Sequence, residues 1–323
     1  MSSADSAGKD GLVSRFAHAL ESYQKSNRTF QVLSSLDRDD AVEAPSADSS
    51  PPGTILVLDS SFNPPTLAHK RMVLSALFES SSSSNSSSSG NSSSSNAHKS
   101  RLLLLLAINN ADKAPKPAAF PQRLAMMSIF GRSLLSDIAS AADPPHHKCA
   151  GVDVAVTTEP YFHAKAAAVA ADDFYHPGVS DSGEVGEQVY LTGFDTLIRI
   201  FNPKYYAPDS MAAVLDPFFA RARLRVTMRT DAEWGDAAAQ EAYLQELRRG
   251  GLERVGGRAA WAERIEMVVR DRRDSEDEEE VIVSSTKVRE AVARRDWGAL
   301  EKLVSEDVAG WIREQGLYAE ASA

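Results

Sequence analysis

Residues 55–77 read ILVLDSSFNPPTLAHKRMVLSAL, a stretch that predicts a buried strand, a tight loop and the first turns of a helix. Residues 55–58 form a short apolar run with the length and β-branched content of a buried strand. The Asn-Pro-Pro at 63–65 ends that strand, because proline cannot donate to a ladder and has a fixed φ. Thr66 is then a suitable helix N-cap, and apolar residues follow it at helical spacing.

The start of that helix has the properties of a phosphate-binding site. Thr66 and His69 are three residues apart, so they share one face of the first turn. Backbone N–H groups there have no intrahelical partner, and the helix dipole adds partial positive charge beside them. We therefore expect a phosphate group to bind next to His69.

Length, composition and charge limit the class of protein. The chain has 323 residues, enough for one large or two ordinary domains, and 43% of them are hydrophobic. A net charge of −10 argues against a nucleic-acid partner, but a small nucleotide needs only a local cationic pocket. The single Cys149 excludes an intrachain disulfide and suits a reducing compartment. No run has the length of a membrane span or a signal core, so we expect no membrane partner and a cytoplasmic or nuclear location, or both.

The chain divides at about residue 53. Residues 11–25 carry apolar side chains on one helical stripe, which predicts a short amphipathic helix. Residues 29–33 predict a strand or an extended docking segment, and an acidic, Ser- and Pro-rich linker follows them. We expect residues 1–53 to form an N-terminal helix and linker that covers an edge of the main domain, residues 54–323.

A low-complexity insert interrupts the main domain. Residues 80–96 consist only of Ser, Asn and one Gly, and cannot bury apolar surface, which predicts disorder. The cost of closing a loop grows slowly with its length, so such an insert is tolerable.

Strands and helices alternate through the main domain. Further strands are predicted at 102–108, 152–156, 188–191, 224–228 and 265–269. Helices are predicted to begin near 121, 162, 237 and 285, and helical spacing also appears at 197–201. This alternation is typical of βαβ units, in which a parallel sheet is covered on both faces. We predict an α/β fold with a Rossmann-like, doubly wound, mostly parallel sheet and a C-terminal helical segment.

Two motifs give the chain its resemblance to a known family. Residues 61–69, SFNPPTLAH, resemble the (H/T)xGH nucleotidyltransferase signature in its SFNPxTxxH form, and residues 283–289, VSSTKVR, resemble the motif ISSTKxR. Both belong to nicotinamide mononucleotide adenylyltransferases, and the run DSSFNPP is similar to fungal-type members. The resemblance covers about residues 53–315 and implies the nucleotidyltransferase fold.

The resemblance implies transfer of the adenylyl group of ATP to nicotinamide mononucleotide, giving NAD and pyrophosphate. The acceptor phosphate is already a nucleophile at neutral pH, so catalysis would consist of positioning and charge stabilisation. Mg²⁺ would arrive on the ATP phosphates, because it keeps several waters and needs few protein ligands. The run His146-His147-Lys148-Cys149 lacks a further Cys or carboxylate at ligand spacing, so we expect no metal site in the protein.

The resemblance also implies which residues bind ATP. His69, with Thr66 beside it, would donate to the α-phosphate, and Arg289 would complete the catalytic set. Ser61 and Phe62 would present their backbone to both substrates. The remaining ATP contacts would come from Ser285, Thr286, Lys287 and Arg289 on the β- and γ-phosphates, and from Gly193 and Asp195.

The mononucleotide side follows in the same way. Lys113 would reach the acceptor phosphate, and Thr158 would lie in the turn that holds the nicotinamide. The run Gly193-Phe194-Asp195 resembles the family's GxD turn, in which Gly allows a close backbone approach and Asp accepts from ribose hydroxyls. Relatives place a Trp in the nicotinamide turn; here Tyr161 or Phe162 would supply the stacking face.

One departure from the family leaves alternatives open. Relatives commonly carry Gly-Gly where this chain has Asp59-Ser60. A carboxylate there repels a triphosphate unless it points back into the sheet or binds Mg²⁺. The alternatives are another ATP-dependent nucleotidyltransferase, or a non-catalytic regulatory protein that binds ATP or NAD at a decayed site. An aminoacyl-tRNA synthetase is a poorer match, because the chain is short and acidic.

Overall fold

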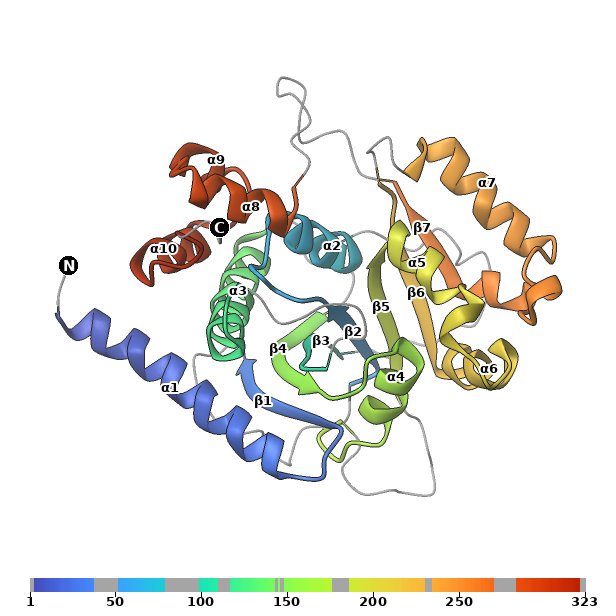
Figure 1. Ribbon diagram of the computed structural model, residues 1–323, viewed down its shortest axis with the longest axis horizontal. Coiled ribbons are helices and arrows are strands. Elements are labelled where there is room, and N and C mark those ends of the chain that lie inside the picture. The colour runs from blue at the N-terminus through green and yellow to red at the C-terminus, as the bar shows by residue number, and fades with distance from the viewer. Residues whose placement is uncertain are drawn as a thin grey trace.

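The structure of this protein is a computed structural model. It describes residues 3–37, 52–78, 99–109, 117–142, 145, 148–175, 186–229, 234–269 and 283–319. Within these ranges seven strands form one sheet in the order β1-β4-β3-β2-β5-β6-β7 (Figure 1). The strands are β1 Phe30–Asp37, β2 Thr54–Asp59, β3 Lys99–Ala107, β4 Lys148–Thr157, β5 Glu187–Gly193, β6 Ala222–Thr227 and β7 Ile265–Val268. The insert 80–96, Lys113, His146 and His147 lie outside the described residues.

The strands β2 to β7 run parallel, and β1 pairs with β4 in the antiparallel sense. The predicted α/β class and the mostly parallel sheet are therefore confirmed. The order also contains a reversal: from β2 the chain moves to β3 and β4 on one side, and later to β5, β6 and β7 on the other. Open α/β sheets bind ligands at the carboxyl ends of the two strands that flank such a reversal, here β2 and β5.

Helices cover both faces of the sheet, as a doubly wound fold requires. The helices are α1 Ser3–Lys25, α2 Leu67–Phe78, α3 Phe120–Ser140, α4 Phe162–Ala170, α5 Phe194–Ile200, α6 Met211–Arg221, α7 Ala237–Arg248, α8 Ser285–Ala293, α9 Trp297–Glu301 and α10 Glu306–Glu314. One core cluster joins the sheet to α1, α2, α3 and the three C-terminal helices, and the other joins it to α4 through α7.

Strand β2 shows why its sequence is continuously apolar. Leu56 and Leu58 belong to the first core cluster, whereas Ile55 and Val57 belong to the second. Successive side chains of a strand point to opposite faces, so a strand covered on both faces needs apolar residues at every position. The predicted C-terminal helical segment is also present, and it packs on the same face as α2.

The N-terminal residues cover an edge of the sheet, as expected. Strand β1 pairs with β4 along its length, and α1 carries Phe16, Leu20 and Tyr23 into the core beside α3. Both elements are longer than predicted, since the helix reaches back to Ser3 and the strand extends to Asp37. Strand β1 thus belongs to the same sheet as the main domain.

Helix α6 was not predicted, and Pro217 stands inside it, where proline usually ends a helix. Two features offset this cost. Ser210 caps the helix by accepting from the N–H of Ala213, and Leu215 and Phe218 are buried in the second core cluster.

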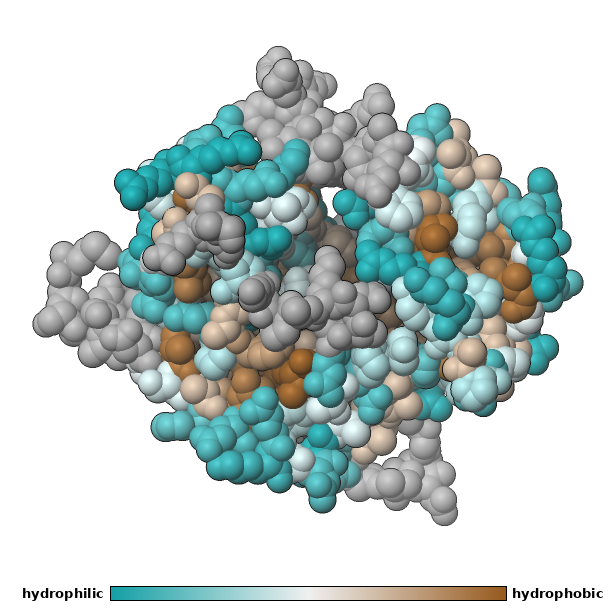
Figure 2. All heavy atoms as spheres, viewed as in Figure 1, coloured by the Kyte–Doolittle hydropathy of each residue, from teal (hydrophilic) through white to brown (hydrophobic). Residues whose placement is uncertain are grey.

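The outer surface agrees with a chain in which a quarter of the residues are charged. On the face shown in Figure 2, hydrophilic residues predominate, and hydrophobic residues appear in small separate groups. No helix within the described ranges is both long and apolar enough to cross a membrane.

Candidate active site

The loop between β2 and α2, residues 60–66, begins at the carboxyl end of β2, beside the reversal in strand order. Its Phe62 has a φ of 43°, in the left-handed region that residues with a side chain rarely adopt. The Phe62 side chain is fully buried, and its ring centroid lies 5.5 Å from that of His69. The backbone of this loop is therefore strained where it turns towards α2, as is common at ligand sites.

His69 is held at both ring nitrogens. The backbone N–H of Thr66 donates to Nδ1 at 3.0 Å, and the Thr66 hydroxyl lies 2.8 Å from the same atom. Nε2 lies 2.9 Å from the Oγ of Ser60. Because Nδ1 accepts from a backbone N–H, the neutral ring carries its proton on Nε2 and donates it to Ser60. His69 and Thr66, predicted to act together, are thus in contact.

The His69 ring is neutral in the free protein. Burial lowers the pKa of His69 to about 4, because the charged form loses its hydration in the loop. At neutral pH the residue is a hydrogen-bond donor through Nε2–H and carries no positive charge. Positive charge at this loop must come from other groups.

The second motif packs directly on the first, although about 220 residues separate them. In α8, the hydroxyl of Ser285 donates to the carbonyl of Pro64 at 2.8 Å, and Arg289 Nη1 donates to the carbonyl of Asn63 at 2.8 Å. The Asn63 side chain in turn accepts from the hydroxyl of Tyr318 at 2.8 Å. The predicted meeting of the two motifs is therefore observed, since α8 contacts the loop that leads into α2 (Figure 1).

The first turn of α8 presents its polar groups beside this contact. The hydroxyl of Ser284 accepts from the N–H of Lys287 at 3.3 Å and caps the helix. Thr286 and Lys287 are exposed, and Arg289 Nη2 donates to the Thr286 hydroxyl at 3.1 Å. The Ser285 hydroxyl braces the loop, whereas Thr286, Lys287 and Arg289 remain at the rim, where a polyphosphate can approach them.

Asp59 does not face the loop as a free carboxylate. It forms an ion pair with Lys165 of α4, and the two side chains are 10% and 5% exposed, respectively. The Lys165 ammonium also lies over the ring of Phe162, 5.3 Å from its centroid. Lys165 was not predicted, because a single lysine in a helix carries no signal of a partner 106 residues away.

The turn after β5 lies across the reversal from the β2–α2 loop, because β2 and β5 are neighbours. Its Asp195 accepts from Arg199 at 2.8 Å through Oδ2 and from Arg229 at 2.9 Å through Oδ1. A Cβ at Gly193 would stand 2.7 Å from Asp195 Oδ1. In the free protein Gly193 thus makes room for the Asp195 carboxylate, where we had expected it to make room for a ligand. Arg229, just beyond β6, was not predicted.

The turn between β4 and α4 holds the remaining candidates for the mononucleotide side. Here the N–H of Thr158 donates to the carbonyl of Thr29 at 3.0 Å. The ring of Tyr161 is 37% exposed and stacks on His163 at 5.6 Å between centroids. Phe162 is half-buried, with Tyr190 in edge contact, so Tyr161 is the residue of the expected pair that offers an open aromatic face.

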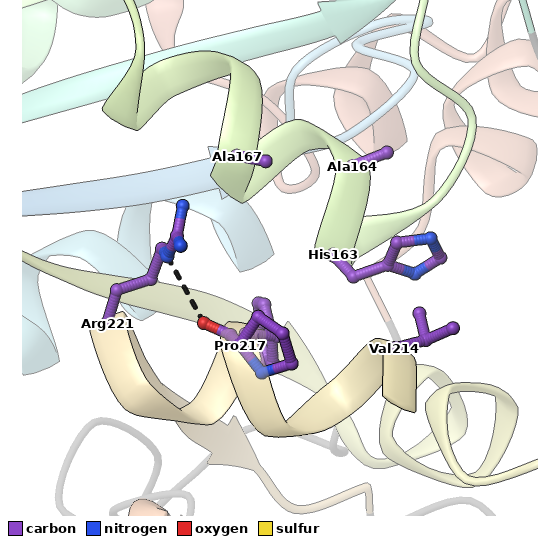
Figure 3. A pocket seen from close by; sticks show the side chains of 7 residues that line it. His163, Ala164, Ala167, Val214, Pro217 and Arg221 are labelled. Atoms are coloured by element: carbon purple, nitrogen blue, oxygen red, sulfur yellow. Dashed lines mark hydrogen bonds between the residues drawn. The ribbon is translucent and has the colours of Figure 1, made fainter. Parts of the chain in front are cut away.

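A cavity of about 260 Å³ lies between α4 and α6, away from both motifs (Figure 3). Its walls are mostly apolar, with His163 and Arg221 as the two polar residues. Arg221 Nε donates to the carbonyl of Pro217 at 3.1 Å, and burial lowers the pKa of His163. None of the lining residues belongs to the predicted site.

A mostly parallel, seven-stranded sheet that carries these two motifs beside its reversal point is typical of an α/β nucleotidyltransferase. The chain matches no protein-family profile. It is 30% identical, over 302 residues, to a Schizosaccharomyces pombe protein named "Putative nicotinamide mononucleotide adenylyltransferase", and the match covers 93% of this chain and 95% of that protein. The chain belongs to the nicotinamide mononucleotide adenylyltransferase family.

Solved structures of low sequence identity are also similar. Plasmodium falciparum nicotinic acid mononucleotide adenylyltransferase, complexed with NaAD, is 14% identical with a TM-score of 0.40, covering 82% of this chain and 97% of that one. The same enzyme complexed with APC is 12% identical with a TM-score of 0.42, covering 82% and 96%. A Vibrio parahaemolyticus protein, described as a "Putative Nicotinate-nucleotide Adenylyltransferase", is 14% identical with a TM-score of 0.31, covering 83% and 96%.

Proposed function

We propose that this protein transfers the adenylyl group of ATP to nicotinamide mononucleotide, giving NAD and pyrophosphate. The observation that carries the proposal is the contact between the two motifs, in which Arg289 and Ser285 of α8 hold the loop that presents His69. A relative named for this activity aligns with this chain over almost the full length of both. In the reaction, an acceptor phosphate oxygen forms a bond to the α-phosphorus of ATP while the bond to the β-phosphate bridging oxygen breaks.

His69 would act on the α-phosphate as a neutral donor. Its Nε2–H points at the Ser60 hydroxyl in the free protein, 2.9 Å away. A phosphate oxygen of the bound nucleotide is a stronger acceptor than a hydroxyl, so it would replace Ser60 as the partner of Nε2. Because Thr66 keeps hold of Nδ1, the ring needs no change of tautomer for this exchange.

The charges around the loop suit a polyphosphate. Lys287 and Arg289 would hold the β- and γ-phosphates, together with the hydroxyl of Thr286 and the N–H groups at the start of α8. They would also stabilise the pyrophosphate as it leaves. Mg²⁺ would arrive on the ATP phosphates and shield their charge. The described residues contain no group of three or more His, Cys, Asp or Glu side chains able to hold an ion.

The mononucleotide would lie towards β4 and β5. The exposed ring of Tyr161 would stack on the nicotinamide, and Thr158 lies in the same turn. Asp195 would accept from ribose hydroxyls, in exchange for one of its two arginine contacts. Lys113 is proposed for the acceptor phosphate from the resemblance alone.

The test is direct. The purified protein is incubated with ATP, Mg²⁺ and either nicotinamide or nicotinic acid mononucleotide, and dinucleotide and pyrophosphate are measured together. We expect equal amounts of both products, with the nicotinamide form as the better acceptor. CTP in place of ATP, and pantetheine phosphate in place of the mononucleotide, serve as controls for other nucleotidyltransferases. Binding of ATP without either product would contradict the proposal and leave a non-catalytic binding protein.

A further inference from the structure

The carboxylate of Asp59 stands at the entrance of the phosphate-binding loop. Asp59 is the last residue of β2, and the next residue, Ser60, is hydrogen-bonded to His69. A negative charge here is one residue along the chain from Ser60, the hydrogen-bond partner of the His69 ring that is proposed to contact the α-phosphate. Where little water screens it, a unit charge near a bound anion changes the affinity for that anion by about tenfold or more.

Lys165 reaches this carboxylate from the opposite side of the sheet. Its helix, α4, packs in the second core cluster, whereas α2 and the loop pack in the first. The ammonium and the carboxylate are 5% and 10% exposed, so water and salt screen the two charges poorly. The pair is therefore fixed in place before any nucleotide arrives.

We propose that Lys165 is the charge-compensating residue of the nucleotide site: by neutralising Asp59, it lets a carboxylate stand beside the phosphate-binding loop without repelling the anionic substrates. The inference rests on the proposed function, because it assumes that a polyphosphate binds at this loop. Asp195 follows the same rule on the other side of the reversal, where Arg199 and Arg229 hold it.

A structural role alone does not account for this arrangement. Buried ion pairs are often no more stabilising than apolar residues of the same volume, so stability is a weak reason for one. Charge compensation makes a prediction that stability does not. Removing either partner breaks the same contact, but the two single variants leave opposite charges beside the loop.

The experiment is a double-mutant cycle of Asp59 and Lys165, in which ATP binding is measured by calorimetry in the presence of Mg²⁺. Lys165→Met leaves a negative charge and should weaken ATP binding about tenfold, whereas Asp59→Asn leaves a positive charge and should strengthen it by several-fold. The double variant Asp59→Asn/Lys165→Met is neutral again and should return to within about twofold of wild type. Inorganic pyrophosphate, titrated in the same way, should follow the same order.

A matched control removes a carboxylate far from the loop. Glu187 is the first residue of β5, at the amino ends of the parallel strands, whereas the loop follows the carboxyl end of β2. Glu187 pairs there with Arg223 and Arg264. Glu187→Gln makes the same change of net charge as Asp59→Asn, and should leave ATP affinity unchanged. An equal gain in both variants would show that net charge alone is responsible, and would overturn the inference.

The remaining outcomes are separable. Weaker ATP binding in both single variants would overturn the role of Lys165 while leaving the proposed function intact. Intact binding and the expected cycle, without dinucleotide product, would overturn the proposed function alone. If thermal unfolding shows that Lys165→Met does not fold, the comparison of Asp59→Asn with the double variant carries the test, and equal affinities would refute the inference.

Discussion

The loop after β2 and the turn after β4 end at the same edge of the sheet, but the chain secures them differently. Partners from residues 285–318 brace the β2–α2 loop: Ser285, Arg289 and Tyr318 hold Asn63 and Pro64, and the carbonyl of Leu303 accepts from the N–H of Leu67. The β4–α4 turn is tied mainly through the carbonyl of Thr29, and beyond it stands an exposed ring, Tyr161.

This difference reflects what each region would bind. A phosphate is recognised by several donors at fixed distances, so the backbone that carries them must be held from many sides. A planar base is recognised by contact with an aromatic face, which several residue types provide. Under the proposed function, the phosphate end would depend on the residues of the two motifs, whereas at the base end Tyr161 would supply the aromatic face.

The largest effect is expected at the braced loop. His69→Ala should lower kcat by about 10²–10³, the usual cost of removing one donor to a developing charge, and should change ATP affinity by only a few-fold. Single-turnover rates and ATP titrations on one preparation measure both quantities. His69→Asn keeps an N–H donor, and should fall between alanine and wild type.

The control for this prediction is His18, an exposed residue of α1. His18→Ala should leave the rate unchanged. If His69→Ala also turned over at the wild-type rate, His69 would be a structural cap of the loop and the comparison between the two regions would lose its catalytic meaning.

Arg289→Ala should come next, with a loss of about 10–100-fold in kcat/KM, since it removes a charge-assisted bond to the phosphates together with the brace on Asn63. Binding of ATP and of pyrophosphate should weaken as well as the rate. Arg289→Lys keeps the charge but not the forked geometry, and should recover part of the loss. Arg313→Ala, which breaks a surface pair with Glu301, is the control. Unchanged pyrophosphate affinity in Arg289→Ala would contradict the assignment.

Tyr161→Ala tests the base end, with an expected rise of about 5–100-fold in the KM for the mononucleotide, the cost of losing one stacking partner. The KM for ATP should change little. Tyr161→Phe keeps the ring and should behave as wild type. An effect on ATP alone would place the adenine, and not the nicotinamide, at this turn.

The last prediction concerns the pH dependence of stability, and it involves no change in catalysis. The pKa of His69 is about 4 in the folded protein and about 6.5 when unfolded, so the unfolded chain binds more protons between these values. Stability should therefore fall as the pH drops from about 6.5 to about 4, with a slope from this residue of at most about 1.4 kcal/mol per pH unit. Urea denaturation of wild type and His69→Asn across this range measures it. Parallel curves would mean that the ring is not buried as described.

Much of the fold was predictable because its signals are local. Apolar runs marked the strands of the parallel sheet, and the proline pair marked the end of β2. The meeting of the two motifs was also predictable, since each follows a strand and parallel strands end at one edge. Helix α6 is harder to predict, because Pro217 is a residue that usually ends a helix. Burial of the apolar face of α6 outweighs that preference.

The contacts that complete the site were harder to predict from the sequence. The pairing of Asp59 with Lys165 and of Asp195 with Arg229 joins residues that no spacing rule connects, so only the folded chain brings them together. The neutral state of His69 was equally hidden, because it depends on burial within the loop. One signal next to the motif was not used: Ser60, the residue before SFNPPTLAH, is the partner of Nε2.

The bracing of the β2–α2 loop by residues 285–318 also has a consequence for the order in which the parts of the site are completed during translation. A ribosome makes β2 and its loop before the strands β3 to β7, and it makes all of these described strands before it reaches α8. Throughout that interval the nascent chain has the phosphate loop but lacks Arg289 and Tyr318, which fix its backbone. Under the proposed function, the ATP site would therefore be complete only after α8 and Tyr318 have been made, so bound ATP would stabilise the folded sheet only after that point.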